Sequence, residues 1–256
     1  MKQAFNIKDF LEEKAALYNR PSFIQTDPIQ VPKQFSKKEN IEIAGFLTAT
    51  IAWGQRTTII KNSLNLIERM DNNPYKLLMD LSENDLSVFE GFKHRTFNSD
   101  DCKFFIRSLK NIYSNHGGLQ KVFEKGFQQR KTIKNALTYF YQIFFEIKEL
   151  PRTRKHVSNV MSGSSAKRLN MFLRWMVRND NKGVDFGIWN NIPQSALMLP
   201  LDIHTGNVAR KLGILSRKQN DWKAVEELTS ILRKYDPNDP IKYDFALFGL
   251  GAFEKF

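Results

Sequence analysis

Cysteine is scarce in this 256-residue chain and occurs once, at Cys102. A single cysteine excludes an intramolecular disulfide, a four-cysteine zinc site and an iron–sulfur cluster held within the chain. The four histidines, His94, His116, His156 and His204, stand singly and lack the paired spacing typical of catalytic metal ligands. We therefore expect no metal, no other cofactor and a cytoplasmic location.

Long hydrophobic runs are also missing. The longest apolar stretches, such as residues 196–201, are far shorter than the ~20 residues that span a bilayer. The N-terminal segment becomes polar before an apolar stretch of signal-peptide length can form. These two absences predict a protein that is neither exported nor bound to a membrane.

Positive charge is abundant. The chain has 39 basic and 27 acidic side chains, a net charge of +12 and a pI near 9.7. This excess of positive charge suits a polyanionic partner such as nucleic acid, but it is equally consistent with lysines that only keep the protein in solution. Residues 151–178 contain seven basic residues and no acidic one: Arg152, Arg154, Lys155, Lys167, Arg168, Arg174 and Arg178. This local excess favours nucleic acid, because it predicts a positive surface where a phosphate backbone could lie.

The apolar pattern is helical almost throughout. Ile133, Leu137, Phe140, Phe144 and Ile147 form one stripe at helical spacing and predict a helix over residues 132–148. Further helices are expected over residues 36–51, 56–70, 104–113, 119–127, 221–235 and 241–253, whereas residues 21–34 and 179–199 are expected to be irregular. The fold class is therefore predicted to be all-α.

The basic stretch itself predicts a helix, a short turn and a second helix. The helices are expected over residues 155–161 and 166–178, with Ser162-Gly163-Ser164-Ser165 between them. Ser164 or Ser165 is a natural N-cap, and the start of the second helix would present N–H groups to a phosphate. A plain helical hairpin explains the same residues.

Lys167 falls in the first turn of that second helix, where its charge opposes the helix dipole. Thirty-five positions later, Asp202 is placed to N-cap a helix that runs to Leu212 and ends at Gly213. Taken alone, Asp202 needs no role beyond this cap.

Together, Gly163-Ser164-Ser165-Ala166-Lys167 and Pro200-Leu201-Asp202-Ile203-His204 resemble two motifs of the helix-hairpin-helix DNA base-excision glycosylases. That superfamily contains endonuclease III and the 8-oxoguanine glycosylases. The spacing between the motifs is closer to that of the archaeal 8-oxoguanine glycosylases, which suggests a related bacterial branch. The Leu-Pro-Gly opening of the family's hairpin is replaced here by Val160-Met161-Ser162.

The resemblance implies a DNA glycosylase with β-lyase activity, which excises a damaged base, with 8-oxoguanine favoured. Lys167 would correspond to the lysine that forms a Schiff base with the sugar, and Asp202 to the catalytic aspartate. The implied partner is double-stranded DNA containing a damaged base, bound by a monomer associated with the nucleoid.

The resemblance also suggests further site residues. Candidates for contacts with the DNA backbone are Ser162, Gly163, Ser164, Ser165, Arg168, Arg210 and Lys211. Candidates for the base pocket, or for a wedge that fills the gap left by an extruded base, are Trp53, Gln55, Arg56, Trp189, His204, Asp244 and Phe248. Core packing is the simpler role for Trp53 and Phe248, whereas a buried Asp244 would need a partner.

The implied fold has two helical lobes with a cleft between them. Residues 35–178 would form the lobe that carries Lys167, and residues 1–34 with 179–256 the lobe that carries Asp202. One alternative is a non-catalytic helical protein of the same fold that binds DNA or RNA. Another is a helical adaptor that binds an acidic protein.

Overall fold

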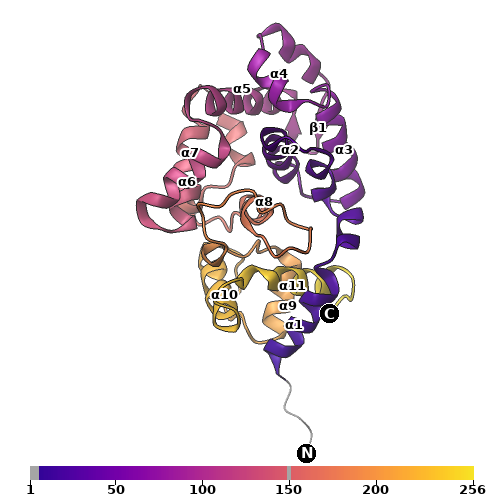
Figure 1. Ribbon diagram of the computed structural model, residues 1–256, viewed down its shortest axis with the longest axis vertical. Coiled ribbons are helices and arrows are strands. Elements are labelled where there is room, and N and C mark those ends of the chain that lie inside the picture. Colours follow the sequence, from indigo (N-terminus) through magenta and orange to yellow (C-terminus); the bar gives the residue numbers. More distant parts are fainter. Residues whose placement is uncertain (1–5, 149–150) are drawn as a thin grey trace, which may run out of the picture. The chain divides into compact units, whose positions relative to one another are not determined.

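The computed structural model describes residues 6–148 and 151–256 and is predominantly helical, which confirms the all-α class (Figure 1). Within this described part the only strands are β1 (Lys93–His94) and β2 (Phe97–Asn98), which pair antiparallel with His94 opposite Phe97. None of its helices is long and apolar enough to cross a membrane.

The chain divides into two compact units. Unit 1 consists of Met1–Phe23 and Val160–Phe256, and unit 2 of Ile24–Asn159. The division expected from the sequence grouped residues 160–178 with residues 35–159, but their helix packs within unit 1. The reason is a set of buried ion pairs that join Arg174 and Arg178 to aspartates at positions 185, 239 and 244, together with a ring contact between Phe172 and Trp189.

Unit 2 contains six α-helices among its described residues: α2 (Lys38–Thr50), α3 (Arg56–Glu68), α4 (Pro74–Asp80), α5 (Ser99–Asn115), α6 (Leu119–Arg130) and α7 (Ile133–Phe144). Its core is aromatic: Phe46 of α2 lies 5.4 Å from Phe140 and 5.5 Å from Phe144 between ring centres, as the predicted stripe on α7 requires. Thr132 caps α7, which ends at Phe144 rather than at residue 148.

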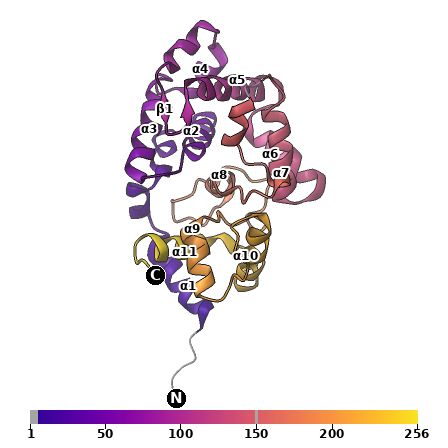
Figure 2. The ribbon, with the colours of Figure 1, turned by 180° about the vertical axis from the view of Figure 1, so that it is seen from behind.

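Unit 1 contains α1 (Ile7–Tyr18), α8 (Lys167–Val177), α9 (Ile203–Lys211), α10 (Trp222–Tyr235) and α11 (Tyr243–Ala252). Both ribbon views show α11 beside α1 and α9 (Figures 1 and 2). Glycines permit this close packing, because a Cβ at Gly249 would lie 2.1 Å from the Tyr18 ring and one at Gly251 would lie 3.0 Å from the Cβ of His204. The last helix is therefore fixed between the first helix and the helix that Asp202 begins.

Two segments expected to be loops contain no α-helix. Residues 21–34 form three short 3₁₀ turns, η1 (Pro21–Thr26), η2 (Pro28–Gln30) and η3 (Pro32–Gln34). The segment 179–199 contains only the 3₁₀ turn η7 (Gln194–Ala196), and it lies along α8, where Phe186 N–H donates to the Trp175 carbonyl and Trp189 N–H to that of Met176. Two further 3₁₀ turns are η4 (Asn84–Phe89) in unit 2 and η8 (Pro240–Lys242) in unit 1.

The predicted helix over residues 155–161 is wrong. The chain there forms two 3₁₀ turns, η5 (Pro151–His156) and η6 (Val160–Ser162), and α8 begins at Lys167. The physical reason lies outside the segment: buried Asp101 of α5 accepts a hydrogen bond from Thr153 Oγ1 at 2.8 Å and lies 3.2 Å from His156 Nε2. These contacts hold Thr153 and His156 against Asp101 of α5 within the 3₁₀ turn η5.

Candidate functional site

The turn that leads into α8 is shaped by residues other than the two expected caps. Ala166 occupies the N-cap position with left-handed backbone angles, φ 49° and ψ 37°, and no side chain caps the helix. The prediction that Ser164 or Ser165 is the N-cap is therefore wrong; Ser164 Oγ instead accepts a hydrogen bond from Ala166 N–H at 3.2 Å within the turn.

The turn is held by the start of α10. Ser164 and Asp221 form an isolated antiparallel bridge, and Trp222 N–H donates to the Gly163 carbonyl at 2.9 Å. Gly163 has φ +86°, a backbone conformation that glycine adopts without strain. These bonds fix the chain immediately before Lys167.

Asp202 has the predicted capping geometry. Its Oδ1 accepts a hydrogen bond from Thr205 N–H at 2.9 Å, and α9 ends at Lys211, just before Leu212 and Gly213. The backbone carbonyl of Asp202 also accepts a bond from Asn220 Nδ2 at 3.2 Å. The carboxylate is half-buried and fixed by the helix that it starts.

Lys167 and Asp202 both lie close to Asp244 of α11. The segments that carry them meet where Ser165 Oγ donates to the Leu201 carbonyl at 3.4 Å. The charges of both Lys167 and Asp202 act on the Asp244 carboxyl group. Lys167 itself is half-buried, with its Nζ 3.7 Å from Met171 Sδ one turn along α8. The structure thus assembles one amine and two carboxyl groups from three segments of unit 1.

Asp244 is the most perturbed member of this group. It is only 5% exposed and accepts a bond from Arg174 Nη1 at 2.5 Å. Burial raises its pKa to about 6, with the charge of Asp202 adding to the rise and those of Arg174 and Lys167 opposing it. A carboxyl group with this pKa exchanges protons near neutral pH, which is a property of general acids and bases.

A buried chain of ion pairs extends from Asp244. Arg174 also binds Asp185, with Nε 3.2 Å from Oδ1, and Asp185 Oδ2 lies 3.0 Å from Arg178 Nη1. Arg178 is 1% exposed and binds both oxygens of Asp239 through its Nε at 3.0 Å. The Phe245 ring lies under both guanidinium groups, 4.4 Å from that of Arg174 and 5.3 Å from that of Arg178.

These pairs reduce the positive surface predicted over residues 151–178. Arg174 and Arg178 are buried and neutralised by aspartates that the local sequence does not contain. Arg152 is also paired, because its Nη1 lies 2.9 Å from Oδ2 of the buried Asp101. Three of the seven charges are thus matched by acids from elsewhere in the chain.

The predicted DNA-contact residues in the turn differ in accessibility. Ser162 and Gly163 are exposed, whereas Ser164, Ser165 and Arg168 are half-buried. Burial lowers the pKa of Arg168 to about 10, so its guanidinium remains charged at neutral pH.

The two predicted contact residues at the end of α9 have separate surroundings. Arg210 donates from Nε to the Arg217 carbonyl at 2.8 Å and from Nη2 to Asn220 Oδ1 at 2.6 Å. It therefore supports the Asn220 amide that binds Asp202. Lys211 is exposed, with its Nζ 5.8 Å from the centre of the Phe256 ring.

The base-pocket candidates of unit 1, apart from Asp244, differ in their surroundings. Trp189 is 1% exposed and packs edge-on against Phe172 at 5.4 Å, so its ring belongs to the core. Phe248 is half-buried and meets Phe23 and Phe253 edge-on. His204, on the first turn of α9, is exposed.

Trp53, Gln55 and Arg56 belong to unit 2 and lie around the start of α3. The Trp53 ring is half-buried, 4.8 Å from the ring of His94 and 6.1 Å from that of His156 between centres. Gln55 is exposed at the N-cap position of α3, and Arg56 is the first residue of that helix. These three residues therefore belong to a different unit from Lys167, Asp202 and Asp244.

Two residues of this group were missed or misread in the sequence. Asn220 was not singled out, although an Asn-Asp pair before a helix is a recognisable capping signal. Arg174 was counted in the predicted positive surface, yet it is the partner that the buried Asp244 required. No three His, Cys, Asp or Glu side chains within residues 6–148 and 151–256 are arranged to hold a metal ion.

Comparison with known families gives one match, which covers residues 27–253 and is described as "Protein of unknown function (DUF2400)". The chain belongs to the DUF2400 family. The DUF2400 match includes Lys167, Asp202 and Asp244 and begins after α1. No curated protein and no solved structure matches the chain.

Proposed function

We propose that the chain is a DNA glycosylase with β-lyase activity that acts on a damaged base in double-stranded DNA. The observation that carries the proposal is the meeting of Lys167 and Asp202 near Asp244, although the first two are separated by 35 positions. An amine beside two carboxyl groups, one of which titrates near neutrality, is suited to attack at a sugar carbon with proton transfer. 8-Oxoguanine is the proposed lesion, on the basis of the sequence resemblance.

The target nucleotide must leave the base stack, because its sugar C1′ is shielded inside the duplex. The proposed architecture for this is a helix-hairpin-helix fold with two lobes and a cleft that receives the extruded nucleotide. The partner is duplex DNA, and the protein acts as a monomer on the DNA of the nucleoid. Ser162 and Gly163, which are exposed beside Lys167, are proposed backbone contacts.

In the proposed reaction, the neutral amine of Lys167 attacks C1′ as the bond from C1′ to the base breaks. The electron pair of that bond leaves with the base, which takes up a proton, and the amine loses a proton. Opening of the sugar ring then gives a Schiff base between Lys167 and C1′. Removal of a proton from C2′ expels the 3′ phosphate and cuts the strand.

The carboxyl groups have different parts in this scheme. Asp202 faces the positive charge that develops on the sugar as the base departs, and its capping bond to Thr205 N–H holds the carboxylate in place. Asp244 accepts the proton that Lys167 must lose, since the charge of Lys167 acts on its carboxyl group and its pKa lies near neutrality. Arg174 positions Asp244 for this transfer.

Borohydride trapping tests the proposal. Wild-type protein incubated with duplexes containing 8-oxoguanine, other lesions or an abasic site should give a covalent adduct when the Schiff base is reduced. Lys167→Gln should abolish the adduct, whereas Lys182→Gln, which changes an exposed lysine of the same unit, should leave it intact. Binding of DNA without an adduct on any substrate contradicts the enzyme and favours the non-catalytic alternative.

Asp202→Asn tests the second residue without removing the helix cap, since asparagine caps as well as aspartate. Base excision in single-turnover assays should slow by about 100-fold or more, because the developing charge on the sugar loses its counter-charge. Trapping on a preformed abasic site should be much less affected. An excision rate equal to that of wild type contradicts the role of Asp202.

A further inference from the structure

The α6–α7 hairpin carries an unusual concentration of exposed positive charge. Its helices contain one acidic residue, Glu124, which is 6% exposed. The hairpin has five basic residues, Lys121, Lys125, Arg130, Lys131 and Lys134, of which the first four are exposed and the last is half-buried. None of the five forms an ion pair with another described residue.

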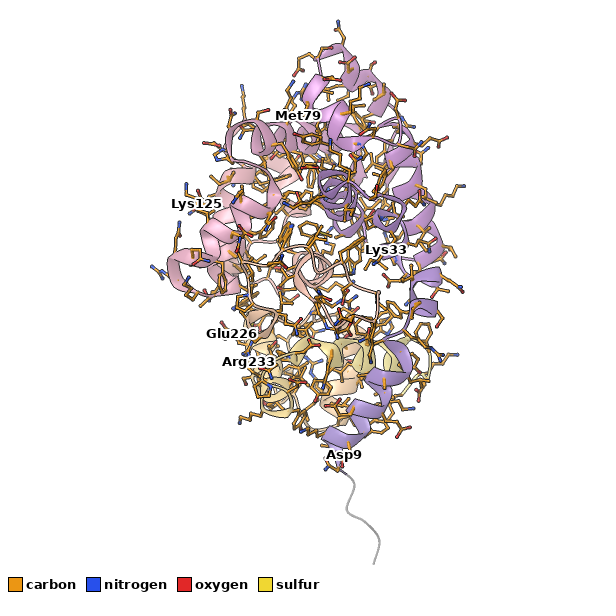
Figure 3. All side chains as sticks on the ribbon, viewed as in Figure 1. Asp9, Lys33, Met79, Lys125, Glu226 and Arg233 are labelled. Atoms are coloured by element: carbon orange, nitrogen blue, oxygen red, sulfur yellow. The ribbon has the colours of Figure 1, made fainter. Side chains whose placement is uncertain are left out.

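The packing of α6 explains why these side chains point outward. The helix buries Val122, Phe123 and Phe127 against its neighbours, and its Gly126 lets α7 approach so closely that a Cβ there would lie 2.9 Å from Ala136 Cα. Lys121 and Lys125 lie one turn apart on the opposite side. Lys125, labelled in Figure 3, is exposed, and its Nζ lies 5.6 Å from the centre of the Tyr139 ring of α7.

The arrangement opposes the stability of the hairpin in isolation. Lys121 and Lys125 are like charges at a spacing of four residues, which repel each other on a helix surface. Lys131 has a left-handed backbone, φ 54°, at the C-cap of α6, where glycine is the favoured residue. An external anion that neutralises Lys121 and Lys125 would relieve their repulsion.

Helix α10 has a mixed surface charge, unlike the α6–α7 hairpin. Its exposed lysines, Lys223 and Lys234, share the helix with Glu226 and Glu227, so its surface carries both signs of charge. Glu226 is also labelled in Figure 3. The contrast shows that an unbalanced basic surface is a property of the hairpin and not of every helix in this basic chain.

The hairpin also lacks the apolar surface that other polyanionic partners require. The large hydrophobic residues that are exposed within the described chain are Leu17, Met79, Val88, Met161, Ile203, Phe253 and Phe256, and none of them lies on α6 or α7. Protein interfaces are centred on buried apolar or aromatic anchors, and helices that bind membranes insert an apolar face. A phosphate backbone needs neither, because counterion release supplies the affinity.

We propose that the α6–α7 hairpin of unit 2 binds the phosphate backbone of double-stranded DNA through residues other than those of the Lys167 group. The choice of DNA as the polyanion rests on the proposed function. The hairpin would contribute affinity without sequence preference, since its side chains reach phosphates as point charges. Binding through it should weaken steeply as salt concentration rises.

The test compares two variants with the same change in net charge. One combines Lys121→Gln, Lys125→Gln and Arg130→Gln on the hairpin, and the control combines Lys218→Gln, Lys223→Gln and Lys234→Gln. The affinity of the full-length protein for an undamaged duplex is measured between 50 and 200 mM salt. Each lost phosphate contact lowers the slope of log affinity against log salt by about 0.9, so the hairpin variant should lose about 2–3 from its slope. The control should keep the slope of wild type.

An unchanged slope in the hairpin variant, or an equal loss in both variants, overturns the proposal, as does a wild-type protein that does not bind the duplex. Borohydride trapping at saturating DNA separates this outcome from that of the proposed function, because the hairpin variant should trap as well as wild type. If wild type never traps but its affinity depends on the hairpin, the hairpin proposal stands and the glycosylase proposal fails. If wild type traps but the salt slope of the hairpin variant equals that of wild type, the glycosylase proposal stands and the hairpin proposal fails.

Discussion

The basic segment at residues 151–178 and the α6–α7 hairpin look similar as strings of letters and differ in the folded protein. The first has seven basic residues and no acid, yet Arg174 and Arg178 are buried in ion pairs and Arg152 is bound to Asp101. The second has fewer charges, but four of them are exposed and none forms an ion pair with another described residue. A local charge count therefore does not predict surface charge, because acids distant in sequence fold against some basic residues and not others.

The type of basic residue, arginine or lysine, also distinguishes the two regions, although a charge count ignores it. The buried charges of α8 are arginines, whose planar guanidinium can bind two carboxylates or both oxygens of one, as Arg178 does with Asp239. Four of the five basic residues on the hairpin are lysines, whose compact ammonium is strongly hydrated and stays in water. Arginine within an apolar helix favours an internal partner, and lysine on an exposed face favours an external one.

Of the changes that compare these two regions, Arg178→Met should have the largest effect on the free energy of unfolding. Asp239, Asp185 and Asp180 would lose their shared cation, and removal of one partner from a buried ion pair costs about 3–5 kcal/mol. Urea unfolding at pH 7 measures the loss. Arg130→Met on the hairpin is the matched control and should change the free energy of unfolding by less than about 0.5 kcal/mol. Equal losses would remove the distinction between the two regions.

Asp244→Asn should have an intermediate, pH-dependent effect. The pKa of Asp244 is raised to about 6, above its value of about 3.9 in an unfolded chain, so the folded state binds the proton more tightly. The stability that this proton contributes is present below pH ~4 and is lost as pH rises through about 6. The free energy of unfolding of wild type minus that of the variant should therefore fall by on the order of 2 kcal/mol between pH 4 and pH 7. A difference that grows with pH would contradict the raised pKa.

The smallest expected effect is on the stability of the hairpin. Lys121→Gln and Lys125→Gln each remove one of two repelling charges, so each should stabilise the protein by a few tenths of a kcal/mol. Urea unfolding at low and high salt measures this gain, which should shrink as salt screens the repulsion. A marked destabilisation by either change would show that these lysines have internal partners, as the arginines of α8 do.

Features set by neighbouring residues could be predicted from the sequence. The stripe on α7 and the Asp202 cap depend on residues within a few turns, and both are present in the fold. The need of Asp244 for a partner also follows from one charged residue in an apolar segment. That partner, Arg174, is 70 positions away, and nothing local identifies it.

The errors share one physical cause. The 3₁₀ turns over residues 151–162 depend on Asp101, which accepts a bond from Thr153 across 52 positions. Ala166 replaces the expected serine cap because Asp221 and Trp222 hold the turn before Lys167. In both places a contact made in the folded chain outweighs the local preference of the residues for helix or cap.

The bridge between Ser164 and Asp221 has a consequence for how this chain tolerates change. Asp221 caps α10, with its Oδ1 3.1 Å from Ala224 N–H, so one residue both starts that helix and anchors the turn that presents Lys167. The loop from Gly213 to Asn220 thereby acts as a spacer of fixed length between α9 and that anchor. Inserting or deleting a residue in this loop should shift Lys167 relative to Asp202 while leaving both helices intact. The length of the loop therefore sets the geometry around the Lys167 amine.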